Sequence, residues 1–270
     1  MVQAYLDTLS EWYKQRGQTI TAFSGGIDSS LVLYLSHYYL GQKGIGCISA
    51  SASLKQKDLD LASDFCQKYG IPLEIIRTDE LNDERYLQNP ANRCYFCKNH
   101  LYIALTALQQ QYPGYTLLNG ANTDDLGDYR PGLQAAQEHN IASPLVDCGI
   151  NKQAVREIAK YLGLEHWDKP ASPCLSSRVP YGDSINPQKL KAIEASEAIL
   201  NNHGFRDVRV RHFGSEARLE VPPEEVERLQ TLFHTVSEEI KSVGFRRCTI
   251  DQEGLVSGKL NRALHESSAV

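Results

Sequence analysis

A run of small, hydroxyl-bearing residues near the start of the chain has the composition of a phosphate-binding loop. It reads Ser24-Gly25-Gly26-Ile27-Asp28-Ser29-Ser30 and lies between an expected buried strand, residues 19–23, and an expected helix, residues 29–39. The glycines allow a tight turn close to a ligand. Backbone N–H groups at a helix start bind anions, and the serine hydroxyls add donors. A bare Ser-Gly-Gly also suits an ordinary helix N-cap, but the full string after a first strand favours a ligand site.

The same string lacks the lysine that a Walker A loop requires after its second glycine. Without that lysine, transfer of a terminal phosphoryl group is not the expected chemistry. The loop therefore predicts phosphate binding for a reaction other than transfer of a terminal phosphoryl group.

Cysteine is the second residue type whose spacing suggests chemistry. The chain has seven cysteines, an odd number, and no secretion signal in its first 20 residues, so a disulfide framework is not expected. Cys94 and Cys97 form a C-x-x-C pair at the start of an expected helix, residues 95–111. The pair is compatible with a redox dithiol, a zinc half-site, an iron–sulfur half-site or two core thiols, although one pair is too few for a structural zinc site.

A third cysteine, Cys174, falls in a segment rich in proline and serine. Three thiolates can hold a 4Fe-4S cluster and leave the fourth iron open. The spacing does not show that Cys174 comes near the C-x-x-C pair. For Cys47, Cys66 and Cys248, reduced thiols in the core are a sufficient explanation.

Two arginines alternate with valines in an expected strand, residues 207–213. Arg209 and Arg211 share one face of that strand, because side chains alternate with a period of two. A pair of guanidinium groups can bind a phosphate through bidentate hydrogen bonds. The alternative is a solvated strand face.

Alternating strand and helix patterns predict an α/β fold with a parallel sheet for the first part of the chain. The expected strands are residues 19–23, 44–49, 73–77 and 116–119, and the expected helices are residues 3–16, 29–39, 55–69, 95–111 and 151–162. Beyond the Pro/Ser-rich segment the pattern predicts a small α+β unit with an antiparallel hairpin, made of residues 187–202, 207–213, 217–221, 223–242 and 247–251. We expect two domains, residues 1–178 and 179–270.

Composition is that of an ordinary globular protein, with 270 residues, 41% hydrophobic and 23% charged. The net charge of -5 gives no overall basic field for nucleic acid, which makes a nucleic-acid partner unexpected. No apolar stretch is long enough to span a bilayer, so we expect no membrane association. A cytoplasmic location is therefore predicted.

The string Ser24–Ser30 resembles the PP-loop, SGGxDS, of the N-type ATP pyrophosphatases. Members of that superfamily cleave ATP to AMP and pyrophosphate while they adenylate a carbonyl or carboxyl oxygen. The resemblance implies a PP-loop ATP pyrophosphatase fold, with a hydroxyl-lined adenosine pocket near residues 22–24 and 49–51, and Mg²⁺ near Asp28. The residues that it implies for nucleotide binding are Ser24, Gly25, Gly26, Asp28, Ser29, Ser30, Ser49, Gly120 and Arg178.

Three more strings, GANTDD from Gly120, DYRPGL from Asp128 and PCLSSRVPYG from Pro173, narrow the resemblance to the LarE family. These enzymes insert sulfur during synthesis of a nickel-pincer cofactor. In one form of the family a single cysteine gives up its sulfur. In the other form three cysteines hold a 4Fe-4S cluster, and Cys94, Cys97 and Cys174 resemble that set.

The LarE resemblance also implies a substrate, a pyridinium biscarboxylate mononucleotide whose phosphate is bound by Arg209 and Arg211. Sulfide or another sulfur donor is implied as a partner, as is a homo-oligomeric assembly. Glu197 and Glu220 match carboxylates that resemble metal ligands in some members. Arg130 and Arg178 are expected near a phosphate, and Asp125 and Asp128 either assist a metal or cap a helix.

Several other functions remain open from the sequence. A sacrificial use of the Cys174 sulfur is the nearest alternative, followed by a tRNA thiolase of the same superfamily. An amide-forming ligase would leave the three cysteines without a role. A nucleotide-sensing module without catalysis is the fourth alternative.

Overall fold

The computed structural model describes residues 1–127, 131–165, 167–168, 172–256, 258–259 and 262. The chain divides into two compact units. The first unit comprises Met1–Glu80 and Asn92–Ser172, and the second comprises Leu81–Ala91 and the chain from Pro173 onward. No helix in the described ranges has the length and apolar character needed to cross a membrane.

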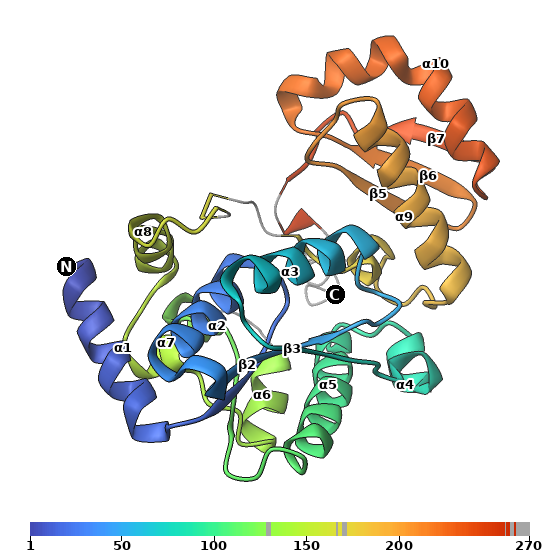
Figure 1. The fold of residues 1–270 in the computed structure, drawn as a ribbon. Coiled ribbons are helices and arrows are strands. Elements are labelled where there is room, and N and C mark those ends of the chain that lie inside the picture. The colour runs from blue at the N-terminus through green and yellow to red at the C-terminus, as the bar shows by residue number, and fades with distance from the viewer. Residues whose placement is uncertain (128–130, 166, 169–171, 257, 260–261, 263–270) are drawn as a thin grey trace. The chain divides into compact units, whose positions relative to one another are not determined.

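The first unit is built on a sheet of four parallel strands (Figure 1). In the order in which they lie side by side, they are β3 (Leu73–Ile76), β2 (Gly44–Ser49), β1 (Thr19–Ala22) and β4 (Thr116–Leu118). All three pairings are parallel, which confirms the fold class that the sequence predicts. The expected strand at residues 44–49 coincides with β2.

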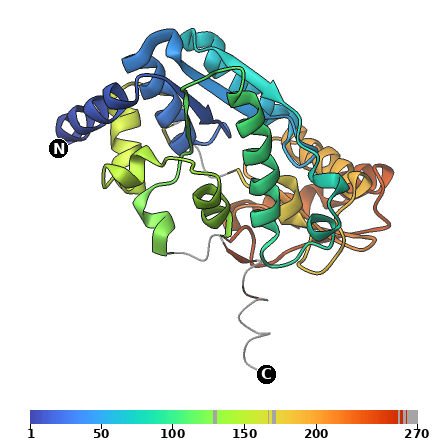
Figure 2. The same ribbon diagram turned by 90° about the horizontal axis from the view of Figure 1, so that it is seen from below.

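Helices cover both faces of this sheet, as Figures 1 and 2 show. Apolar side chains of α1, α2, α3 and α8 form the core on one face, together with Ile48 and Leu118. Side chains of α5 and α6 form the core on the other face, together with Ile20, Ala22 and Leu117. Neighbouring residues such as Leu117 and Leu118 therefore point to opposite faces, as the pleat requires.

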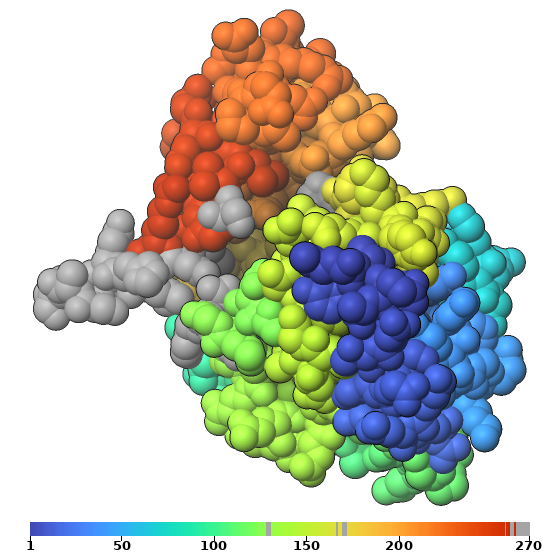
Figure 3. Space-filling view, turned by 90° about the vertical axis from the view of Figure 1, so that its left-hand side faces the viewer, coloured from blue at the N-terminus to red at the C-terminus, as the bar shows by residue number. Residues whose placement is uncertain are grey.

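The helices of the first unit are α1 (Val2–Arg16), α2 (Ile27–Leu40), α3 (Gln56–Tyr69), α5 (Arg93–Gln109), α6 (Pro131–Glu138), α7 (Pro144–Asp147) and α8 (Lys152–Tyr161). Of these, α6 and α7 are short and were not expected from the sequence. On the surface of the unit α1 and α8 lie side by side (Figure 3). Short 3-10 turns occupy Gly41–Lys43, Glu80–Asn82 and Thr123–Gly127.

The second unit holds a smaller sheet of three strands, in the order β5 (Arg209–Phe213), β6 (Glu216–Glu220) and β7 (Arg247–Ile250). The pair β5–β6 is the expected antiparallel hairpin, while β7 joins β6 in parallel. The helices α9 (Pro187–Asn202) and α10 (Val226–Ser242) pack on the sheet over an apolar core. The unit also contains α4 (Glu84–Leu87) and the 3-10 turns Leu175–Arg178 and Pro223–Glu225.

The order of the four parallel strands determines where a ligand can bind in the first unit. From β1 the chain runs to β2 and then β3 on one side, and β4 is added on the other side. The strand order therefore reverses at β1, and ligands of open α/β sheets bind beyond the carboxyl ends of the strands at such a point. The loop of residues 23–26, which joins β1 to α2, lies there.

Gly120, just after β4, lies directly against the first turn of α2. A Cβ atom on Gly120 would be 2.6 Å from the Ser29 nitrogen and 2.8 Å from its Cα. Backbone atoms of a buried helix start cannot move away easily. Any larger residue at this position therefore displaces either β4 or the loop after β1.

Replacing Gly120→Ala should lower the thermal unfolding temperature by several degrees, because overpacking of this kind costs about 1–3 kcal/mol. The change Gly127→Ala is the matched control, since a Cβ there meets nothing within 4 Å. Thermal unfolding followed by circular dichroism measures both. Equal unfolding temperatures for the two variants would contradict this packing argument.

Candidate active site

The loop between β1 and α2 is closed by hydrogen bonds among its own residues. The Ser24 and Ser29 hydroxyls lie 3.0 Å apart, and the Ser24 backbone N–H donates to Ser29 Oγ at 3.2 Å. Ser29 Oγ in turn donates to the Gly26 carbonyl at 3.0 Å. Gly25 has a φ of +70°, a left-handed conformation that favours glycine, and Gly26 caps α2 in an extended conformation. The backbone therefore turns sharply where the sequence predicts the phosphate loop.

The closed loop leaves the first backbone donors of α2 available. The Ser30 N–H donates to the Gly26 carbonyl, which starts the helix. The preceding N–H groups, those of Ile27, Asp28 and Ser29, have no acceptor within the helix, as in any first turn. With the helix dipole behind them, these amides and the serine hydroxyls can hold an anion such as pyrophosphate.

Asp28, the acidic residue of the loop, is engaged on both carboxylate oxygens. Lys152 Nζ, at the start of α8, donates to Asp28 Oδ2 at 2.5 Å. Asn122 Nδ2 donates to Asp28 Oδ1 at 3.3 Å. The sequence reasoning missed both partners. Lys152 and Asp28 are 124 positions apart in the sequence, and no local pattern could have joined them.

The turn after β4 is held by side chains that the sequence singles out. Asp125 Oδ2 accepts a hydrogen bond from the Asn122 N–H at 3.1 Å, and Asp124 Oδ2 accepts one from the Lys152 N–H at 3.1 Å. Asp125 thus closes a turn in the structure, which is the capping alternative for this residue. Asp128 and Arg130 lie outside the described residues.

Hydroxyl groups gather at the carboxyl ends of β2 and β3, where the PP-loop resemblance implies adenosine. Ser49 Oγ and Thr78 Oγ1 are 2.7 Å apart, and Ser51 Oγ and Ser53 Oγ are 3.0 Å apart. A role of Ser49 in nucleotide binding stays a prediction. The edge of the sheet nevertheless offers donors and acceptors for a ribose or a base.

Glu80 follows β3 at this same edge and was not expected as a site residue. It is 1% exposed, and neither carboxylate oxygen has a hydrogen-bond partner in the described structure. Buried carboxylates without partners are rare because desolvation is costly. Glu80 can therefore accept hydrogen bonds from a ligand without breaking existing ones.

The C-x-x-C pair begins α5, as its spacing predicts. Cys94 is exposed and Cys97 is half-buried. Arg93 Nη2 donates to Cys94 Sγ at 3.9 Å. Cys174 belongs to the second unit and is half-buried, just before the 3-10 turn that carries Arg178.

The remaining cysteines are unsuited to sulfur or metal chemistry. Burial raises the pKa of the Cys47 and Cys66 thiols to about 12. Burial also raises the pKa of Cys148 and Cys248 to about 11. Because the thiolate is the nucleophile and the metal ligand, these four thiols stay inert at neutral pH. That leaves the three cysteines that the sequence analysis selects.

The three candidate cysteine ligands are divided between the two units. Within either unit, the described side chains include no group of three or more His, Cys, Asp or Glu that could hold a metal ion. Two of the candidate ligands lie in the first unit and the third in the second. The donor types, all thiols, are those that an iron–sulfur cluster needs.

Two arginine–glutamate pairs stand in the core of the second unit. Arg178 donates to Glu197 at 2.8 and 3.2 Å, and Arg211 donates to Glu220 at 3.0 and 3.0 Å. Arg211 also donates to the Ser177 carbonyl at 2.7 Å. Each pair is bidentate and buried. The two glutamates expected as metal ligands are thus already engaged by guanidinium groups.

Arg209 differs from Arg178 and Arg211, although it lies beside them. No hydrogen bond or ion pair joins its half-buried side chain to the residues that the structure describes. Burial lowers the pKa of Arg209, and the neighbouring charges of Arg211 and Arg178 lower it further. A cation without a partner next to two others is a favourable place for an anion.

Comparisons with known proteins extend these observations to the whole chain. No family model matches the sequence. An uncharacterized protein of Synechocystis sp. is 40% identical and aligns over 98% of this chain and 99% of its own length. A tRNA-specific 2-thiouridylase of Clostridium tetani is 26% identical over 59% of this chain and 53% of its own length, which supports a PP-loop fold.

A named enzyme is similar over nearly the full length of both units. The pyridinium-3,5-bisthiocarboxylic acid mononucleotide synthase of Lactiplantibacillus plantarum is 33% identical over 258 residues. The match covers 95% of this chain and 94% of that enzyme. The closed serine–glycine loop and this full-length similarity lead to one conclusion, that the chain belongs to the LarE family of PP-loop enzymes.

Proposed function

We propose that this protein is an ATP-dependent sulfurtransferase that converts a carboxylate of a pyridinium carboxylate mononucleotide into a thiocarboxylate, with release of AMP and pyrophosphate. The observation that carries the proposal is the closed loop at the point where the strand order reverses, followed by amides at the start of α2 that have no acceptor among the described residues. The similarity to a synthase whose name specifies a bisthiocarboxylic acid mononucleotide supports the choice of substrate.

The first step is adenylation of the substrate. A carboxylate oxygen attacks the α-phosphorus of ATP, and pyrophosphate departs toward the amides of Ile27, Asp28 and Ser29. Donors fixed in advance stabilise the charge that grows on the leaving group. Asp28 is the residue that would hold Mg²⁺, which neutralises phosphate charge when it is bound.

The second step replaces AMP with sulfur. Adenylation makes the carboxyl carbon reactive, because AMP leaves far more easily than oxide. A sulfide then bonds to that carbon, AMP leaves with the oxygen, and a thiocarboxylate remains. Cys94, Cys97 and Cys174 are the residues that would hold a 4Fe-4S cluster, which supplies sulfide when bound. In the sacrificial alternative, Cys174 gives up its own sulfur.

The substrate's phosphate is assigned to the second unit. Arg209 provides the guanidinium group that lacks a partner in the described structure, while Arg211 is occupied by Glu220 and Ser177. Arg209 is therefore the residue to which we assign direct contact with the phosphate. Arg211 can add its charge at short range without leaving its carboxylate. Homo-oligomeric assembly and a cytoplasmic location stay predictions.

Asp28→Asn should reduce the release of AMP and pyrophosphate on the order of 100-fold, since it removes the carboxylate that would hold Mg²⁺ beside the leaving pyrophosphate. Release is measured with ATP, Mg²⁺ and a pyridinium carboxylate mononucleotide. Asp60→Asn, an exposed position of α3, is the control and should retain full release. Unchanged release in Asp28→Asn would argue against the loop as the site of ATP cleavage.

Arg209 and Arg211 should have different roles, Arg209 in binding the substrate's phosphate and Arg211 in stabilising the fold. Arg209→Gln should raise the KM for the mononucleotide about tenfold or more, because a charge-assisted hydrogen bond is lost while the fold is kept. Arg211→Gln should cost about 3–5 kcal/mol of stability, since it removes the bidentate partner of the buried Glu220 and leaves it only the longer 3.9 Å contact with Lys259. Steady-state kinetics and chemical denaturation measure the two effects, with Arg218→Gln on β6 as control. Equal KM values for Arg209→Gln and the control would remove Arg209 from the phosphate site.

Anaerobic reconstitution should give about four irons per chain if the three cysteines hold a cluster. Cys94→Ala, Cys97→Ala and Cys174→Ala should each lose the iron, whereas Cys148→Ala, a thiol kept protonated by burial, should retain it. Iron and acid-labile sulfide are counted on the purified chain. A colourless protein in which Cys174 becomes dehydroalanine after turnover would replace the cluster form with the sacrificial form.

A further inference from the structure

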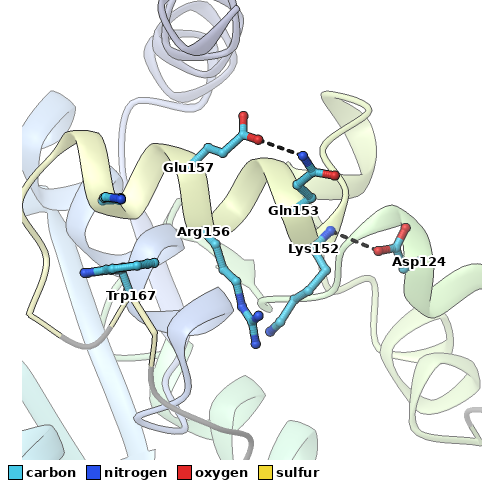
Figure 4. Close-up of a pocket in the computed structure, with 7 residues that line it drawn as sticks. Asp124, Lys152, Gln153, Arg156, Glu157 and Trp167 are labelled. Atoms are coloured by element: carbon cyan, nitrogen blue, oxygen red, sulfur yellow. Dashed lines mark hydrogen bonds between the residues drawn. The ribbon is translucent and has the colours of Figure 1, made fainter.

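A pocket of about 490 Å³ is lined mainly by residues of α8 (Figure 4). We call it the α8 pocket. Apart from Asp124, which belongs to the GANTDD string, its lining residues did not enter the sequence-based prediction of the site. They are Asp124, Lys152, Gln153, Arg156, Glu157, Lys160 and Trp167.

Three cations follow one face of the helix in this pocket. Lys152, Arg156 and Lys160 are four residues apart, which puts neighbours about 6 Å apart along the helix axis. In Figure 4 Arg156 and Lys152 point to one side of α8, and Glu157 points to the other. Glu157 accepts a hydrogen bond from Gln153 at 2.9 Å. The stripe of positive charge is therefore not neutralised by the nearest carboxylate of its own helix.

Arg156 is the cation that is available to a ligand. No hydrogen bond, ion pair or ring contact joins it to the part of the chain that the structure describes. Lys160 instead places its ammonium 4.7 Å from the centroid of the Trp167 ring. The pocket thus has a cation without a partner, a second one on an aromatic wall, and space beside both.

Lys152 connects the pocket to the loop after β1. Its backbone N–H is bonded to Asp124 of the pocket, and its ammonium is bonded to Asp28 of α2. The loop itself offers neutral donors, amides and hydroxyls, and relies on Lys152 for a nearby cation. From Asp28 outward, positive charge therefore continues from Lys152 to Arg156 and then to Lys160.

We propose that the α8 pocket is a second oligophosphate site, which receives pyrophosphate after it leaves the loop of α2. The proposal rests on the proposed function for the source of the anion. Arg156 and Lys160 bind the anion, and Trp167 forms the wall. Lys152, Arg156 and Lys160 follow one another along α8 from the neutral donors of the loop, and this succession of cations favours transfer of the anion out of the loop.

Trp167 provides a direct readout of this pocket. The chain has two tryptophans, so Trp12→Phe leaves Trp167 as the single fluorophore. Binding of pyrophosphate should draw the Lys160 ammonium away from the indole ring and change its emission. The titration uses inorganic pyrophosphate, with orthophosphate in a second arm and sodium sulfate at equal ionic strength as the control for screening.

Arg156→Gln in the same background should raise the Kd for pyrophosphate about tenfold, while Lys14→Gln, an exposed lysine of α1, should not change it. In steady-state assays Arg156→Gln should also weaken product inhibition by pyrophosphate and leave the KM for ATP within about twofold. Circular dichroism confirms that both variants fold.

The possible outcomes distinguish a failure of the second-site proposal from a failure of the proposed function. Pyrophosphate binding by calorimetry with no change in Trp167 emission, and with equal affinity in Arg156→Gln, would overturn the second site and leave the sulfurtransferase proposal standing. A response to sulfate as large as the response to pyrophosphate would also overturn it. A normal Trp167 response in a protein that releases no AMP would count against the proposed function alone.

Discussion

The first turn of α2 leaves backbone N–H groups without an acceptor in the part of the chain that the structure describes, and the hydrogen bonds and packing around the preceding loop are arranged about that turn. A helix start with unpaired donors is costly unless something satisfies them. Here the serines of the loop bond to one another and to Gly26, so that they fix the turn without occupying the amides. Gly120 allows β4 to end directly against the same turn.

In the second unit, the side chains of Arg178, Arg209 and Arg211 lie close together, so that their charges repel one another. Two of them are neutralised by buried glutamates in bidentate pairs. Such pairs add little net stability, because desolvation offsets attraction, but they fix side chains firmly in place. The third, Arg209, has no hydrogen-bond or ion-pair partner among the residues that the structure describes, and it lies close to the charges of Arg178 and Arg211.

The sequence predicts the regular parts of both units because hydrophobic periodicity and turn residues are local signals. The strand at residues 44–49 and the helix at residues 187–202 agree with β2 and α9. The sequence could not predict which of the two strand arginines, Arg209 or Arg211, bonds to Glu220. Arg209 faces Glu220 across the hairpin by register, yet Glu220 bonds to Arg211 on the diagonal, and side-chain reach decides between them. The bond of Lys152 to Asp28 was equally beyond prediction, since it depends on how α8 packs against α2.

The raised pKa values of four thiols determine which cysteines of this protein oxidants can attack. Four cysteines are held in their protonated form by burial. Peroxides and electrophiles react with thiolates, so these positions are shielded from them. Oxidative damage would then fall on Cys94, Cys97 and Cys174. In the proposed reaction, a molecule oxidised at these three positions would still cleave nucleotide at the loop after β1 but would deliver no sulfur.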